Sequence, residues 1–191
     1  MSSIDLIAGY LVERARPSVF IPLAMLIAAS AWVAAPGKPP SATDFALCAT
    51  EALLLVLALR VWDDLEDRAR DAARHPDRVT VRARRTGPLV ALAVLLAVCG
   101  ALLLGTATSP AARIAIVGSI GLGLLVWYRV RPTEPSRLSG IVLLAKYPAL
   151  AIALAPGLGE LTPMRAAAAA GLLYLIVGTY EYLEDRPRGI S

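Results

Sequence analysis

Cysteine, histidine and charged residues are all scarce in this 191-residue chain, which has two cysteines, one histidine and 18% charged residues. Cys48 and Cys99 lie inside apolar stretches without metal-ligand spacing, so we interpret them as small packing residues. His75 lies in the loop sequence Arg74-His-Pro-Asp-Arg, which favours a turn position over a catalytic base. The sequence therefore indicates neither a disulfide framework nor a cysteine metal centre.

Apolar residues, by contrast, make up 57% of the chain, and its mean hydropathy is +0.63. Six apolar runs approach the roughly 20 residues that cross about 30 Å of hydrocarbon. We therefore predict an all-α, polytopic transmembrane helix bundle that forms one domain over residues 1–191. Residues 4–14 are expected to form a short interfacial helix. The six predicted spans cover residues 17–35, 44–62, 88–107, 111–130, 138–156 and 165–183.

The distribution of the 19 lysines and arginines predicts the orientation of these spans. Fifteen lie in the amino-terminal segment, the second-to-third loop, the fourth-to-fifth loop and the carboxyl-terminal tail. Only Lys38, Arg113 and Arg165 fall on the other side, and Lys146 lies within a span. The positive-inside rule thus places both termini in the cytoplasm. Since orientation accounts for the net charge of +4, we expect membrane lipids and no nucleic acid as partners.

An acidic cluster follows the second apolar run and contains Asp63, Asp64, Asp67 and Asp71. No proline or glycine interrupts this segment, so the helix is expected to continue through it. At 100° per residue, Asp63, Asp67 and Asp71 then form one stripe with Asp64 nearby. Such crowded carboxylates repel one another, and a divalent cation would turn this repulsion into attraction. The alternative is a solvated helix end that is balanced by nearby arginines.

A second acidic cluster follows the sixth run, where Glu181 and Asp185 form an i,i+4 pair before Pro187. Both clusters are expected at the cytoplasmic ends of their spans. Magnesium commonly binds through a few carboxylates together with substrate phosphates, so two such clusters suggest a clamp for a metal-bound pyrophosphate. The alternative is a snorkelling helix end with Arg186 and Arg188 as partners.

The first cluster resembles a known motif. The pattern Asp63-Asp64-x-x-Asp67-x-x-x-Asp71 is similar to the first aspartate-rich motif of the UbiA superfamily of intramembrane prenyltransferases, written Asn-Asp-x-x-Asp-x-x-x-Asp. Its position after the second helix is also similar. In this chain Asp63 stands where the family usually has asparagine.

The second cluster carries the same resemblance. Glu181-x-x-x-Asp185 is similar to the second family motif, Asp-x-x-x-Asp, which follows the sixth helix. Here glutamate replaces the first aspartate of that motif. Family members usually have nine helices, so a cavity completed by self-association remains an open alternative for the six helices expected here.

The resemblance implies an Mg²⁺-dependent transfer of an isoprenyl group from a prenyl diphosphate to a lipophilic acceptor. It also implies roles for individual residues. The implied metal ligands are Asp63, Asp64, Asp67, Asp71, Glu181 and Asp185, of which Asp67 and Asp71 also belong to the catalytic set with Lys146. The implied substrate-binding residues supply basic groups for the diphosphate and aromatic rings that shield an allylic cation. They are Arg68, Tyr128, Arg129, Arg131, Tyr147, Tyr174 and Tyr180.

Lys146 lies in the middle of the predicted fifth span, where a charge costs about 2.5–3.5 kcal/mol on insertion scales. One interpretation is that Lys146 faces an internal polar cavity and binds the diphosphate or a counter-carboxylate. The other is that it packs between helices, paired with Glu51. The neighbouring Tyr147-Pro148 sequence predicts a kink in this span.

Two further functions fit the same pattern. A terpene cyclase on the same scaffold would capture the allylic cation with an internal alkene in place of an acceptor. A catalytically inactive membrane scaffold or assembly protein would use its acidic ends to bind basic protein surfaces.

Overall fold

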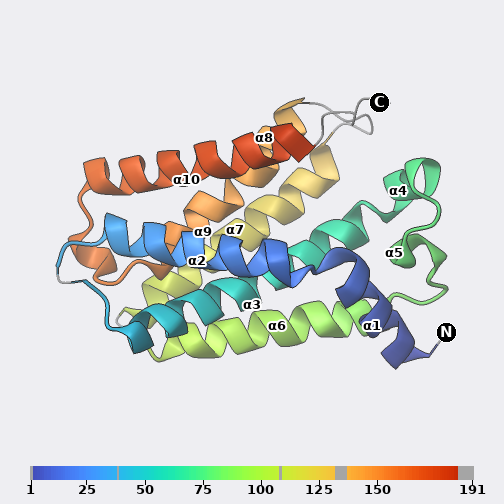
Figure 1. The fold of residues 1–191 in the computed structure, drawn as a ribbon, viewed down its shortest axis with the longest axis horizontal. Helices are drawn as coiled ribbons and strands as arrows, with labels where there is room; N and C mark the ends of the chain where they lie inside the picture. The colour runs from blue at the N-terminus through green and yellow to red at the C-terminus, as the bar shows by residue number, and fades with distance from the viewer. Residues whose placement is uncertain (1, 38, 108, 132–136, 185–191) are drawn as a thin grey trace.

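The computed structural model describes residues 2–37, 39–107, 109–131 and 137–184, with the backbone alone for residues 137, 138 and 181–184. All regular structure in these ranges is helical (Figure 1). The long helices are α2 (Pro17–Ala34), α3 (Ala42–Glu66), α6 (Gly87–Gly105), α7 (Pro110–Val130) and α10 (Pro163–Glu184). The short elements are α1 (Ser3–Arg14), α4 (Arg68–Arg74), α5 (Val79–Arg82), α8 (Arg137–Leu144), α9 (Lys146–Leu154) and a 3₁₀ turn at Leu158–Glu160.

Four described helices, α2, α3, α6 and α7, are long and apolar enough to cross a membrane. They coincide with the first four predicted spans to within a few residues, which confirms the all-helical, membrane-type fold class. The run predicted at 165–183 lies within α10. The run predicted at 138–156 differs, because it consists of two short helices in place of one continuous span.

The interruption between α8 and α9 falls at Ala145, three residues before Pro148. Proline has no backbone N–H, so Pro148 cannot donate the helical hydrogen bond to the carbonyl oxygen of Leu144. The Ala145 N–H instead donates to the Val142 carbonyl at 3.2 Å. The kink predicted from Pro148 is therefore confirmed, and it places Lys146 at the first position of α9.

The short helix predicted over residues 4–14 is present as α1, which begins with a capping box formed by Ser2 and Asp5. Its apolar face buries Leu6 and Tyr10 in a small cluster with Val61 of α3 and Leu89 of α6. Figure 1 shows α1, α4 and α5 at one end of the bundle, which the last described turns of α10 also reach. We call this end the aspartate end, because α3 finishes there with its acidic cluster.

The main core lies between α2, α3, α9 and α10. Helices in lipid gain little from apolar burial and associate through close packing of small residues. On α2, Ala24, Ala28 and Ala31 are each no more than 2% exposed, and they let the neighbouring helices approach closely. By contrast, α6 and α7 are only 17% buried over their most apolar windows and present most of their surface outward.

Gly100 of α6 packs closely against Leu55 of α3. A Cβ atom at this position would lie 2.7 Å from Cδ2 and 3.0 Å from Cγ of Leu55, whereas a Cβ at Gly118 of α7 meets nothing within 4 Å. We expect Gly100→Ala to cost about 1–3 kcal/mol through overpacking. Gly118→Ala is the matched control and should be neutral or stabilising by up to about 1 kcal/mol through helix propensity. Thermal unfolding in detergent measures both, and equal melting temperatures would contradict the close contact.

Candidate functional site

The centre of the aspartate end is the buried carboxylate of Asp63, near the end of α3. The Tyr128 hydroxyl of α7 donates to Oδ1, and the Lys146 ammonium of α9 donates to Oδ2. Asp63, Tyr128 and Lys146 are all less than 10% exposed. Lys146 thus binds a counter-carboxylate, and its partner is Asp63 and not Glu51. This single cluster joins three helices.

Aromatic rings and one further cation surround this cluster: the rings belong to Trp62 and Tyr147, and the cation is Arg131. The Trp62 ring lies 5.9 Å from the Tyr128 ring, centroid to centroid, and the guanidinium carbon of Arg131 lies 4.4 Å above the same ring. The Lys146 ammonium lies 5.3 Å from the Tyr147 ring centroid. Both cations are therefore placed for cation–π attraction in addition to their ion pairs.

Asp64 faces a different side of α3 and is held by α1. The Tyr10 hydroxyl donates to Asp64 Oδ2 at 2.9 Å, and Arg14 donates to both carboxylate oxygens, at 2.8 Å and 3.2 Å. Arg60, one turn earlier on α3, lies 3.3 Å from Oδ2. Burial and the Asp64 carboxylate raise the pKa of the Tyr10 hydroxyl well above its ordinary value, so it stays protonated and donates.

Asp67 and Asp71 lie past the end of α3, because Asp67 is the junction between α3 and α4. Asp67 Oδ1 lies 2.7 Å from Arg131 and 3.7 Å from Arg70. Burial raises the pKa of the Asp67 carboxyl, although Arg131 opposes that shift. Asp71 Oδ1 pairs with Arg78, and Asp71 Oδ2 is buried without a hydrogen-bond partner among the described residues.

Each of the four carboxylates therefore pairs with a different cation, and the predicted clustering of these aspartates along one helix face is not observed. Over the residues that the structure describes, no group of three or more acidic, histidine or cysteine side chains is placed to hold a metal. Asp63 and Asp64 fit a metal poorly, since both oxygens of each already accept hydrogen bonds. Asp71 fits best, because Oδ2 is unengaged. The Glu181 side chain and all of Asp185 lie outside the described residues.

The remaining predicted substrate-binding residues have varied positions. Arg68 donates to the backbone carbonyls of Thr80 at 3.0 Å and Ala83 at 2.6 Å, so it holds the segment between α4 and α6. The Tyr174 hydroxyl donates to the Ile141 carbonyl at 3.0 Å and links α10 to α8. Arg129 is exposed at the end of α7. None of these three contacts the Asp63 cluster through an interaction the structure describes.

Two cavities flank α3 near this cluster. The first, which we call the arginine cavity, has a volume of about 490 Å³. Its charged lining consists of Glu13, Arg14, Arg16 and Arg60, and Tyr147 and Tyr180 line it as well. Its apolar lining comes from α2 and α10 and includes Phe20, Leu23, Leu26, Ile176 and Val177. The cavity therefore has a cationic end next to Asp64 and an apolar interior along α2.

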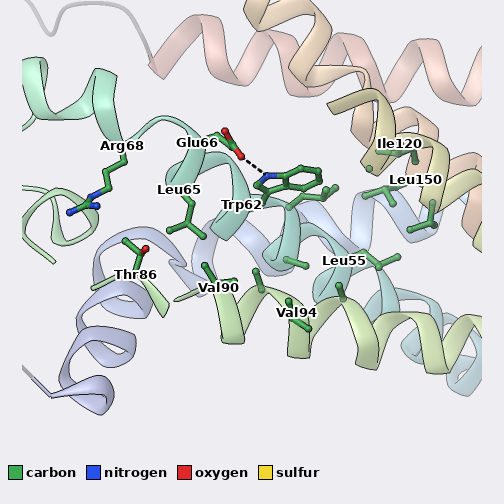
Figure 2. A pocket seen from close by; sticks show the side chains of 16 residues that line it. Leu55, Trp62, Leu65, Glu66, Arg68, Thr86, Val90, Val94, Ile120 and Leu150 are labelled. Carbon is green, nitrogen blue, oxygen red and sulfur yellow. Dashed lines mark hydrogen bonds between the residues drawn. The ribbon is translucent and has the colours of Figure 1, made fainter. Parts of the chain in front are cut away.

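The second, which we call the tryptophan cavity, has a volume of about 620 Å³ and lies between α3, α6 and α7 (Figure 2). At one end are Glu66, Arg68 and Thr86, and the indole N–H of Trp62 donates to Glu66 Oε1 at 3.1 Å. Figure 2 shows Leu55 and Leu150 at the other end. Almost all of the remaining lining is aliphatic.

The residues missed by sequence reasoning are Tyr10, Arg14, Arg60 and Arg78. The i,i+4 spacing of Arg60 and Asp64 could have revealed one of these contacts. Tyr10 is 54 positions from Asp64, and no local pattern links them.

Comparisons with protein-family models, with curated proteins and with solved structures find no match to this chain. Its function therefore has to be argued from the residues themselves.

The pairing of Lys146 with Asp63 can be tested by removing one charge and then both. Lys146→Met leaves a buried carboxylate unpaired, so we expect a loss of about 3–5 kcal/mol in stability. Adding Asp63→Asn to this variant should restore most of the loss. Arg129→Met removes an exposed charge and should change stability by less than about 0.5 kcal/mol. Unfolding in detergent measures all three, and additive losses in the double variant would argue against the pair.

Proposed function

We propose that this chain is a UbiA-type intramembrane prenyltransferase with six spans and cytoplasmic acidic motifs. It transfers an isoprenyl group from a prenyl diphosphate to a lipophilic acceptor. The observation that carries this proposal is the arginine cavity, whose charged lining has three arginines and one glutamate. An anionic head and an apolar tail match its two ends, and its volume is typical of ligand sites. Guanidinium groups suit phosphate oxygens through paired hydrogen bonds.

The chemistry follows from that placement. The bond between the allylic carbon and the diphosphate oxygen breaks, and the electron pair leaves with the diphosphate. Arg14, Arg16 and Arg60 stabilise the charge that develops on the leaving group. The allylic carbon then forms a bond to the acceptor nucleophile, which loses a proton. The Tyr147 ring lines the same cavity and offers a face to the cation before capture.

Magnesium belongs to this proposal as the counter-ion of the diphosphate. Mg²⁺ commonly uses only one or two protein carboxylates and completes its shell with substrate phosphates and water. Asp71 and Asp67 are the described residues suited to hold it, because Asp71 Oδ2 is unengaged and Asp67 lies one turn away. Mg²⁺ would supply charge neutralisation for the departing pyrophosphate. Neither Asp67 nor Asp71 lines the arginine cavity in the described structure.

Arg16 provides the sharpest test of the arginine cavity, because it is exposed at the start of α2 and no ion pair engages it in the described structure. Arg16→Met should leave folding unchanged. We expect it to raise the half-saturating concentration of farnesyl or geranylgeranyl diphosphate about tenfold, equivalent to about 1.4 kcal/mol. Pyrophosphate release by the purified protein in nanodiscs with Mg²⁺ provides the measurement. Arg165→Met, a matched loss of an exposed arginine at the start of another helix and outside the cavity, should behave as wild type, and equal effects of both variants would refute the assignment.

Asp67→Asn tests the acidic motif in the same assay. Loss of pyrophosphate release in this variant supports a metal role, and equal release would remove it. Product mass separates transfer, which leaves an acceptor adduct, from cyclisation, which leaves a hydrocarbon or an alcohol. A wild-type protein that releases no pyrophosphate from any prenyl diphosphate would favour the scaffold alternative.

A further inference from the structure

Two charged side chains are buried far from the aspartate end, and the proposed transfer does not use them. Glu51 of α3 is 6% exposed and Arg113 of α7 is 5% exposed. Glu51 precedes Asp63 by twelve residues, or about 18 Å along α3. Its neighbours on α3, Cys48, Ala52 and Leu55, all belong to the apolar core. Ionisable residues in such a setting are costly, and they usually mark a function.

Each of these two side chains has one buried polar atom without a hydrogen-bond partner among the described residues. Arg113 donates one N–H to the Ala155 carbonyl at 2.9 Å, which anchors the guanidinium at the end of α9. Arg113 Nε and Glu51 Oε1 are both buried without a hydrogen-bond partner among the described residues. The two groups are near enough to interact electrostatically, yet no ion pair joins them in the described part of the chain.

The charges of this pair define the group that fits between them. Their sum is zero, so neither a cation nor an anion is favoured. The Arg113 N–H requires an acceptor, and the Glu51 carboxylate oxygen requires a donor. A carbonyl or an ether oxygen meets only the first requirement. A neutral hydroxyl meets both, because one oxygen accepts from Arg113 while its hydrogen is donated to Glu51.

The tryptophan cavity supplies room for the rest of such a molecule. Leu55 and Val117 lie one helical turn from Glu51 and Arg113, on the same faces of α3 and α7. Both line this cavity, and Figure 2 places Leu55 beside Leu150 at the end away from Arg68 and Thr86. Glu51 and Arg113 do not themselves line the cavity, and an apolar chain in it would end one helical turn from them.

We propose that Glu51 and Arg113 bind the hydroxyl group of a neutral lipophilic alcohol whose apolar body occupies the tryptophan cavity. This site is distinct from the arginine cavity, which lies on another side of α3 and suits an anionic head. It requires neither diphosphate nor metal.

The test compares farnesol with farnesyl methyl ether, which has the same chain but cannot donate a hydrogen bond. Binding of each labelled probe to the full-length protein in nanodiscs is measured without diphosphate or metal, and the signal of empty nanodiscs is subtracted. We expect the wild type to bind farnesol about tenfold more tightly than the ether. Equal affinities would overturn the proposal, and this is the result expected if only water bridges the pair.

Glu51→Gln should weaken farnesol binding about tenfold and reduce the preference over the ether, because an amide oxygen is a weaker acceptor than a carboxylate. Glu160→Gln is the matched control, because it makes the same substitution at an exposed glutamate that lines neither cavity. That variant should retain both the affinity and the preference. If the pair only holds the helices together, Glu51→Gln will lower the melting temperature yet keep the preference, which also overturns the proposal.

Val117→Phe tests the same binding site if the Glu51→Gln variant does not fold. The larger ring fills the inner end of the cavity and leaves both charged groups in place. Loss of farnesol binding in this variant supports the site, and unchanged binding would overturn it.

Discussion

The fold at the aspartate end depends on the pairing of a buried lysine with a buried aspartate. A lone lysine within a span is costly, and so is a lone carboxylate, but the pair with a tyrosine hydroxyl satisfies both. Asp63, Tyr128 and Lys146 come from α3, α7 and α9, so this one cluster fixes the position of three helices. It also explains why a charged residue is tolerated at this buried position, because the Lys146 ammonium balances the Asp63 carboxylate.

Cation pairing explains why the aspartates diverge. The end of α3 is surrounded by α1, α7, α9 and the segment after α4, and each of these elements supplies a basic group to a different carboxylate. One of those basic groups, Arg14, lines the arginine cavity together with Arg60, which pairs with Asp64 from α3 itself. An anionic headgroup in that cavity would therefore share its cations with Asp64. Ligand binding and the anchoring of α1 are in this way connected through the Arg14 guanidinium.

Sequence reasoning predicted the helices better than the site. Sequence patterns predicted four helices that are long and apolar enough to span a membrane, the short amino-terminal helix, and the helix break before Lys146. These features depend on nearby residues alone. Periodicity placed Asp63, Asp67 and Asp71 around one helix axis, but it contained no information about the elements that surround that helix. Contacts such as Tyr10 with Asp64 depend on tertiary packing. The two cavities likewise arise between helices that are distant in the sequence.

A continuous set of contacts crosses from one cavity to the other. Trp62 lines the tryptophan cavity and packs on Tyr128, whose hydroxyl donates to Asp63. Asp63 pairs with Lys146, and the Lys146 ammonium lies over the ring of Tyr147, which lines the arginine cavity.

Such a path couples ligand binding in the two cavities only if one element along it has two conformations, and if the ligand in each cavity favours one of them over the other. The ion pair is the weakest candidate for such an element, since separating two charges in a low-dielectric core is expensive. The Trp62 side chain is the better one, because its only described polar contact is with the exposed Glu66, and a rotation of the indole would change one cavity wall and the support of Tyr128 together.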